Sequence, residues 1–467
     1  NTQIFLFEPQ IIRSIATLVD LQNEASMQIR ASAFYALDGF VKFRGKATEV
    51  YNSVSASANH GILLQNVRAV ADEITRLPED LTPQANGERI APSNEPSGDL
   101  GLLVDAVLTF VAAVAGSSGS TMMVASAGLM PLLVHIVDHC KSRRYLVQRT
   151  VSRAIGLIDS LVYAHIPAFT TFCDAHGLDV YVTRIEQEID FNIEHPEPES
   201  GIVVSPQIAG VENDTRDNLY GKLTFGGASL LRNLFKSIAH MMTSTGTADG
   251  LRNLIDTSLL ASLRKIMDLR EIFGPQILAL CINIMANFVH NEPTSLTTIQ
   301  EKKLPDRFFE MVEQDIEANF EVIASIPNAI SAICLNQAGL DLFNSKQIVQ
   351  KLIKLLVSDR HVKILQDREN ASMFGTAIDE LVRHQPSVKD SVIRALLEAL
   401  EDINARGAEW TAEKDDAKKA IALKPAGEPE PTPQIYELVT VNSPEEQPFS
   451  LEEHVRSSVT LSDLIVD

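Results

Sequence analysis

Residues 128–136 read Gly-Leu-Met-Pro-Leu-Leu-Val-His-Ile, and this stretch decides the fold. Leu129 follows a glycine, and further apolar residues return at Leu132, Leu133 and Ile136. Apolar residues that recur three, four and seven places apart lie on one face of an α-helix. The sequence therefore predicts an amphipathic helix that begins directly after Gly128.

Four further copies of this phrase follow, each with a small or polar residue before the leading apolar one. They begin at Gly177-Leu178, Ser258-Leu259, Lys303-Leu304 and Gln347-Ile348. The intervals between the five leading apolar residues are 49, 81, 45 and 44 positions, and the long one contains the polar stretch 191–220. A helical period of roughly 40 to 47 residues is typical of armadillo and HEAT arrays. The predicted fold is all-α, an armadillo/HEAT-like α-solenoid whose acidic insertion and acidic tail are disordered.

Composition along the chain predicts where this array is interrupted. Residues 78–98 are rich in Pro, Asn, Gly and Ser, which do not sustain a helix. Acidic, Pro-containing segments bury too little apolar surface to fold alone. The expected organisation is a first armadillo-like block at 1–77, a linker loop at 78–98, a second block at 99–189, an acidic insertion at 190–218, a third block at 219–405 and an acidic, mostly flexible tail at 406–467.

Two stretches carry more local expectations. The stretch 28–43 predicts a helix, and the stretch 100–115 contains Asp105 and is shorter than a bilayer span, which favours a buried helix. The apolar face expected for the first helix consists of Ile29, Ala33, Ala36, Leu37 and Phe40.

The charge of the chain argues against nucleic acid and membranes as partners. The net charge is −21 and the pI is near 5.0, so the summed field repels phosphate backbones and anionic headgroups. The four cysteines lie far apart in apolar helical phrases, as expected for small buried side chains in a reducing compartment. They are Cys140, Cys173, Cys281 and Cys334.

Motifs that carry chemistry are weak in this sequence. Cys173 and His176 have the spacing of half a zinc site, but no second pair follows at finger spacing. His135 and His139 lie one turn apart, with Ile136 where a zinc protease has its general-base Glu. We therefore predict no catalytic residues, no metal site and no cofactor, and a self-contained enzyme is the least favoured reading.

Two sets of polar residues are candidates for binding. Asn283 and Asn287 lie one turn apart on an expected helix, and each amide offers a donor and an acceptor to the backbone of an extended peptide. Capping or interhelical hydrogen bonding is the alternative. The densest basic cluster is a candidate dock for acidic partners or for the acidic tail, with a solvated face as the alternative. It consists of Lys141, Arg143, Arg144, Arg149 and Arg153.

Several phrases resemble one family. The phrases at 29–38, 59–64, 326–336 and 377–387 are similar to the N-terminal armadillo-like region of the giant HECT-type E3 ubiquitin ligases, which comprise the mammalian HECT, UBA and WWE domain ligase and its fungal and plant relatives. The resemblance implies an α-solenoid that gathers substrates, while a C-terminal HECT domain transfers ubiquitin. The family's Thr-Cys-Phe-type catalytic phrase is absent, since Thr171-Phe172-Cys173 has another order.

From the resemblance we expect the substrate-recruiting scaffold of such a ligase. The chain starts at Asn1 without an initiator Met, so we expect a piece of a longer protein. The expected partners are protein substrates and other parts of the parent ligase, with the ubiquitin-conjugating enzyme bound only through the HECT domain. The expected location is the cytoplasm and nucleus. A stand-alone armadillo-type adaptor or transport receptor that binds extended peptides is the alternative.

Overall fold

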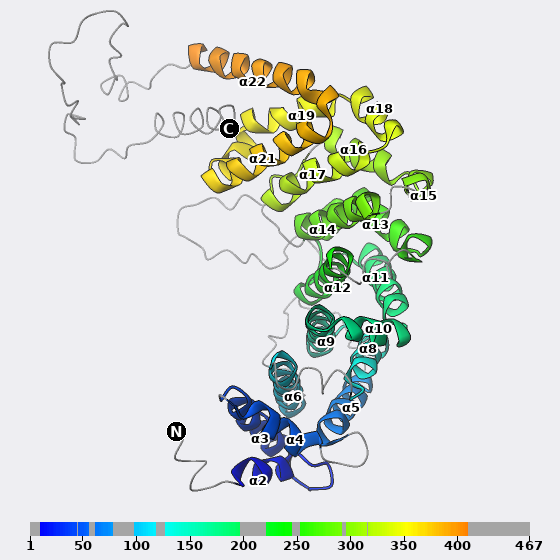
Figure 1. Cartoon of the computed structure of the whole chain (residues 1–467), viewed down its shortest axis with the longest axis vertical. Coiled ribbons are helices and arrows are strands. Elements are labelled where there is room, and N and C mark those ends of the chain that lie inside the picture. The colour runs from blue at the N-terminus through cyan, green and yellow to red at the C-terminus, as the bar shows by residue number, and fades with distance from the viewer. Residues whose placement is uncertain are drawn as a thin grey trace, which may run out of the picture.

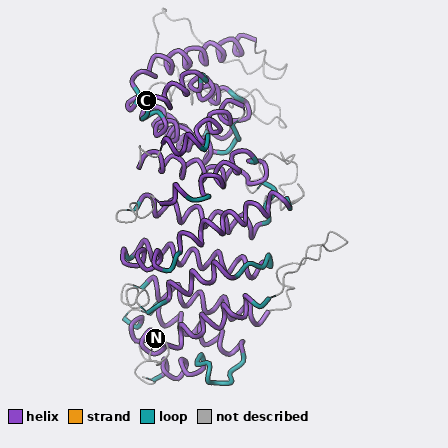
Figure 2. Tube along the Cα trace, turned by 90° about the vertical axis from the view of Figure 1, so that its right-hand side faces the viewer, coloured by secondary structure: helices purple, strands orange, loops and turns teal. Residues whose placement is uncertain are grey.

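The structure is a computed structural model that describes most of the chain. It covers residues 10–43, 45–55, 61–77, 98–117, 127–196, 221–244, 253–291, 296–314 and 316–409. These residues form helices and turns without any strand, and the helices stack into a curved, elongated array (Figures 1 and 2). The prediction of an all-α solenoid is therefore confirmed.

Two rows of helices run along the array (Figure 1). Within each row, successive helices contact one another along most of its length. The outer, convex row consists of α5 (Gly61–Thr75), α8 (Leu129–His139), α11 (Gly177–Glu194), α13 (Leu259–Asp268), α16 (Leu304–Gln314) and α19 (Ile348–Lys354). The inner, concave row consists of α3 (Met27–Val41), α6 (Gly98–Gly116), α9 (Tyr145–Ala164), α12 (Phe225–Thr243), α14 (Arg270–Asn291), α17 (Phe320–Ile333) and α21 (Arg368–His384).

The remaining elements connect the rows or close the ends of the array. They are α2 (Ile11–Leu18), α4 (Ala47–Ser55), α10 (Ile166–Asp174), α15 (Leu296–Glu301), α18 (Gln337–Ser345), η4 (Leu355–Val357), α20 (Asp359–Leu365), η5 (Pro386–Val388) and α22 (Lys389–Glu409).

The repeated phrase marks the outer row. Its five copies begin α8, α11, α13, α16 and α19, so the sequence period is the period of the stack. In four copies the residue just before the helix has left-handed backbone, with φ of 96° at Gly128 and 56° at His176 and Lys303, and 51° at Gln347. This conformation turns the chain sharply from the preceding segment into the outer helix. It favours glycine, because a Cβ there approaches the following carbonyl oxygen.

Gln347 adopts this unfavourable left-handed conformation, and its exposed side chain contributes little packing that could offset the strain. We expect Gln347→Gly to stabilise the array by about 0.5–1 kcal/mol, measured as a rise in the urea midpoint. Gln187→Gly is the matched control, because that exposed residue lies inside α11, where glycine costs about 1 kcal/mol. A destabilising Gln347→Gly would contradict the argument.

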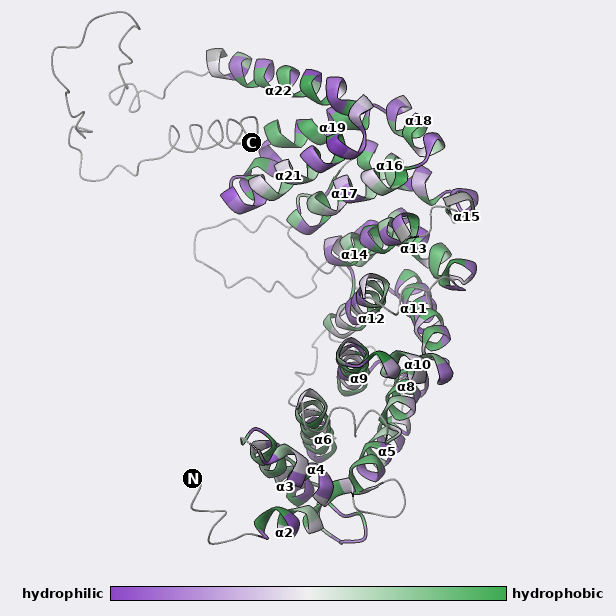
Figure 3. Ribbon diagram, in the orientation of Figure 1, coloured by the Kyte–Doolittle hydropathy of each residue, from purple (hydrophilic) through white to green (hydrophobic). Residues whose placement is uncertain are grey.

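The apolar core runs through the whole array. Buried apolar residues form one cluster from Ile12 to Ala399, so the three predicted blocks share a continuous core. Apolar and polar residues alternate along the helices (Figure 3), as expected where each helix buries part of its surface on its neighbours. The apolar faces predicted for single helices thus pack together into the core of the whole stack.

Helix ends differ from the predicted boundaries in three places, and the smallest difference is at α6, which begins at Gly98 inside the predicted linker 78–98. Helix α11 continues to Glu194, inside the insertion predicted at 190–218, and α22 continues to Glu409, beyond the predicted end of the third block. Asp190 is bound by Lys265 on α13, which holds the end of α11 against the next repeat. The rest of the linker, insertion and tail, at 78–97, 197–218 and 410–467, lies outside the described residues.

The apolar face of α3 is not the predicted one. Ala33 and Leu37 are buried as expected, but Ile29 is 48% exposed and Ala36 is also exposed. Phe34, absent from the predicted face, is fully buried. The reason is that α3 contacts α2 and α4 as well as α6, so its buried surface is wider than one stripe.

Two inner helices are long and apolar enough to cross a membrane by length and composition alone. These are α6 and residues 270–290 of α14, and 56% and 67% of their most apolar windows are buried in the array. In α14, Gly274 with φ of 74° kinks the helix before Pro275. Both helices serve as core helices of the stack, as predicted for the stretch 100–115.

Candidate protein-interaction surface

The inner helix α14 leaves one narrow stripe open to solvent. In α14, every residue from Ile277 to Val289 is buried except Leu280, Asn283 and Asn287. Because α14 contacts α12, α13 and α17, this stripe faces the side without a neighbouring helix. That side is the concave face of the array (Figure 1).

The candidate amides Asn283 and Asn287 lie on this concave stripe. Both are half-buried, and neither makes a hydrogen bond to another residue of the described part of the chain. The neighbouring inner helices carry similar amides, Asn233 on α12 and Asn328 on α17. These four asparagines are called the amide row below, and peptide contact at Asn283 and Asn287 stays a prediction.

The sequence did contain a signal for the two asparagines that the prediction missed. Asn233, Asn283 and Asn328 are separated by 50 and 45 positions, close to the repeat period. Residues at equal offsets in successive repeats stack in a row, because each repeat is one supersecondary unit.

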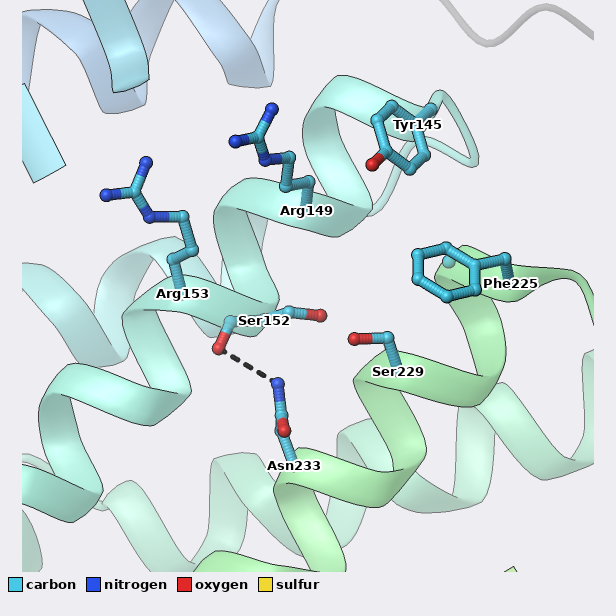
Figure 4. A pocket seen from close by; sticks show the side chains of 8 residues that line it. Tyr145, Arg149, Ser152, Arg153, Phe225, Ser229 and Asn233 are labelled. Carbon is cyan, nitrogen blue, oxygen red and sulfur yellow. Dashed lines mark hydrogen bonds between the residues drawn. The ribbon is translucent and has the colours of Figure 1, made fainter. Parts of the chain in front are cut away.

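A shallow pocket opens between α9 and α12 on the same face (Figure 4). Its volume is about 160 Å³. The Nδ2 of Asn233 donates to the carbonyl oxygen of Ser152 at 3.3 Å and joins the two helices at the floor. Side chains around the pocket are Tyr145, Arg149, Ser152, Arg153, Phe225, Ser229 and Asn233.

Two residues of the predicted basic cluster border this pocket. Arg149 donates to Asp105 of α6 at 2.9 Å, and Arg153 donates to the same carboxylate oxygen at 2.6 Å. Arg153 also donates to the Thr109 hydroxyl at 2.8 Å. The hydroxyl of Tyr35 on α3 donates to the other oxygen of Asp105 at 2.7 Å. This network ties three successive inner helices together.

Burial and charge shift the pKa values in this network. Partial burial, the hydrogen bond to Asp105 and its charge raise the pKa of Tyr35 to about 12. Burial lowers the pKa of Arg153, against the opposing effect of Asp105, and Arg153 remains cationic at neutral pH because an unperturbed guanidinium titrates above 12. The cluster of two arginines and one carboxylate therefore holds an excess positive charge.

The other members of the predicted basic cluster lie elsewhere. Arg143 pairs with the buried Glu188 of α11, and its guanidinium lies 3.8 Å from the ring centroid of Phe191. Lys141 is exposed and Arg144 half-buried, in the turn before α9. Of the five residues, the structure thus places only Arg149 and Arg153 at one concave site. Docking of an acidic partner stays a prediction.

The cysteines are mostly buried, whereas the histidines of the two weak motifs are accessible, with the His176 and His139 side chains 82% and 51% exposed. Cys140, Cys281 and Cys334 are buried and Cys173 is half-buried, and all four are free thiols. Burial raises the pKa of Cys334 to about 12 and also raises that of Cys281, so these thiols are protonated at neutral pH. No group of three His, Cys, Asp or Glu side chains suited to a metal ion occurs among the described residues.

Two family models match the chain. The model described as Domain of Unknown Function (DUF913) matches residues 152–459, and the model described as Domain of Unknown Function (DUF908) matches residues 1–72. The chain belongs to the DUF913 family. The match covers more than half of the chain, from α9 through the rest of the array.

Relatives of this DUF913 chain are named as ubiquitin ligases. The E3 ubiquitin-protein ligase ptr1 of Schizosaccharomyces pombe is 30% identical over 405 residues, which are 87% of this chain and 12% of the ligase. The E3 ubiquitin-protein ligase HUWE1 of Mus musculus is 25% identical over 429 residues, which are 88% of this chain and 9% of the ligase. The chain thus spans about a tenth of the length of these relatives, and the predicted resemblance to the HECT-type ligases is confirmed.

Among solved structures, the chain is similar to a designed armadillo repeat protein, YIII(Dq)4CqI, with a TM-score of 0.40 and 13% identity. The similarity covers 69% of this chain and 99% of the designed protein.

Proposed function

We propose that this chain is the substrate-recruiting scaffold portion of a HECT-type E3 ubiquitin-protein ligase. Ubiquitin transfer is then carried out by a HECT domain outside this chain, and the partners are protein substrates and other parts of the ligase, in the cytoplasm and nucleus. The observation that carries the proposal is the row of accessible amides along the concave face of a chain whose relatives are E3 ligases.

The concave face is suited to an extended peptide for a physical reason. An extended backbone presents an N–H and a C=O at each residue, and an asparagine amide can bond to both. The half-buried Asn283 and Asn287 have no protein partner among the described residues, so binding a peptide breaks no existing bond of theirs. Each hydrogen bond is worth about 0.5–1.5 kcal/mol in affinity.

The test is a pair of substitutions in the full-length ligase that contains this chain. We expect Asn283→Ala with Asn287→Ala to lower substrate ubiquitylation by about tenfold, since two lost hydrogen bonds cost roughly 1–3 kcal/mol. The array should keep its stability, because alanine favours the helix. Ubiquitin thioester formation on the HECT domain should be unchanged.

The matched control is Gln187→Ala with Gln314→Ala, which removes two exposed amides from the outer helices α11 and α16. This control should modify substrates at the normal rate. Normal substrate modification by a ligase from which the whole concave array has been removed would overturn the recruiting role. A reading frame that ends soon after Asp467 would instead favour the alternative function, a stand-alone armadillo-type adaptor or transport receptor that binds extended peptides.

A further inference from the structure

The two helices that form the concave pocket carry an unusual charge for this protein. Helices α9 and α12 contain four cationic side chains, Arg149, Arg153, Arg232 and Lys236, and a single carboxylate, Asp159. The chain as a whole has a net charge of −21. Even with Asp105 of α6 counted against them, the two helices that form the pocket carry an excess of positive charge in an acidic molecule.

Arg149 has donors left for a ligand. Its side chain is 51% exposed, and its only hydrogen bond within the described residues uses one terminal nitrogen on Asp105. Asp105 in turn is shared with Arg153, so one carboxylate serves two guanidinium groups. A second carboxylate, delivered by a ligand, would complete the pairing in a geometry that guanidinium groups favour.

The polar and apolar groups that line the pocket beside Arg149 and Arg153 determine which kind of ligand can bind there. Ser152 is only 7% exposed and its Oγ has no hydrogen-bond partner among the described residues, a cost that a bound acceptor would remove. Its hydroxyl and that of Ser229 point toward one another across the pocket (Figure 4). On the rim, the Phe225 side chain is 44% exposed and lies opposite Tyr145, where an apolar residue can pack.

We propose that this pocket binds a glutamate or aspartate side chain of an extended acidic peptide from a protein partner. The volume of about 160 Å³ admits one side chain, whereas small-molecule sites usually measure roughly 300–1,000 Å³. Arg149 donates to the carboxylate, the serine hydroxyls complete its hydrogen bonds, and the next apolar residue of the peptide packs on Phe225 and Tyr145. This inference rests on the proposed recruiting function and gives it a partner chemistry.

The experiment measures fluorescence polarisation of the labelled peptide GSELELESG with the full chain at physiological ionic strength. We expect Arg149→Gln and Ser229→Leu each to weaken binding about tenfold, the first by removing the donor and the second by filling the pocket. Arg68→Gln is the matched control, because it makes the same charge change on the exposed side of the outer helix α5. It should leave binding unchanged.

Other outcomes contradict the proposal. Equal weakening by Arg149→Gln and Arg68→Gln would mean unspecific attraction by net charge, and equal binding of the glutamine peptide GSQLQLQSG would exclude a carboxylate site. Binding of a phosphoserine peptide alone would assign the pocket to a phosphate instead. Thermal melts of each variant exclude unfolding as the cause.

The same variants separate this inference from the proposed function. Absent peptide binding by the unchanged chain, together with normal substrate modification by a full-length ligase with Arg149→Gln, overturns the acidic site and leaves recruitment by the amide row intact. Specific peptide binding by a ligase that needs no concave face for its substrates overturns recruitment instead.

Discussion

Replacing Glu188 by alanine should destabilise the array by about 3–5 kcal/mol. Glu188 and Arg184 on α11 are 1% and 3% exposed, and the Arg184 Nε donates to the Glu188 carboxylate at 3.0 Å. Arg143 approaches the second carboxylate oxygen. Without Glu188, the buried guanidinium of Arg184 has lost its countercharge, and burial already lowers the pKa of Arg184. An unpaired buried charge is among the most costly changes a protein can suffer.

The same arginine also closes the end of an outer helix. Its Nη1 donates to the carbonyl oxygens of Val137 and Cys140, at 3.3 and 3.0 Å, where α8 ends. A cation at a helix C-terminus satisfies free carbonyl groups and complements the helix dipole. Glu188 therefore holds the residue that joins α8 to α11, and its loss should loosen both helices together.

Urea denaturation and hydrogen exchange measure this effect. The urea midpoint should fall, and the amides of α8 and α11 should lose protection before those of α16 and α17, because stability in a solenoid is largely a sum of local terms. Glu188→Gln should cost less than alanine, since it keeps a hydrogen-bond acceptor. Glu194→Ala, at an exposed position of the same helix, should stay within about 0.5 kcal/mol. Equal effects at positions 188 and 194 would refute the role of the buried pair.

The period of the array could be predicted from the sequence, because the outer helices carry the same spacing of apolar residues on the face that packs against the core. Each outer helix presents one apolar face to the core, so Leu129, Leu259 and Ile348 stand at equivalent positions. Helix α3 packs against three other helices, and such a wide buried surface gives no single apolar stripe in the sequence. This is why the predicted face of α3 included Ile29 and omitted Phe34.

The concave pocket could not be predicted, because it joins helices that are distant in the chain. Its walls come from α9 and α12, and the segment between them includes α10, α11 and residues outside the described part. Arg149 and Asp105 are 44 positions apart. Clustering along the sequence grouped Arg149 with Arg143, although the first faces the concave side and the second pairs with α11. The sequence offered two signals for the site: the basic cluster, which contained Arg149 and Arg153, and the spacing of the amide row, which contains Asn233.

Phe34→Ala should destabilise the array by about 3–5 kcal/mol, the usual cost of deleting a buried phenylalanine ring. Phe34 is fully buried on α3, and its ring centroid lies 5.6 Å from that of Phe110 on α6. Removal of the ring leaves a cavity between two inner helices that depend on each other for burial. The loss should appear as a lower urea midpoint and as faster exchange in α3 and α6.

Ile29→Ala is the matched control. It removes an apolar side chain from the same helix, but Ile29 is 48% exposed. A side chain that is half in water in the folded state loses little burial on truncation, so we expect a cost below about 1 kcal/mol. The ratio of the two effects decides between the predicted amphipathic stripe, which places Ile29 in the core and leaves Phe34 out of it, and the stacked arrangement, which places only Phe34 in the core. Comparable losses at both positions would mean that α3 is rotated relative to its place in the array, with Ile29 against α6.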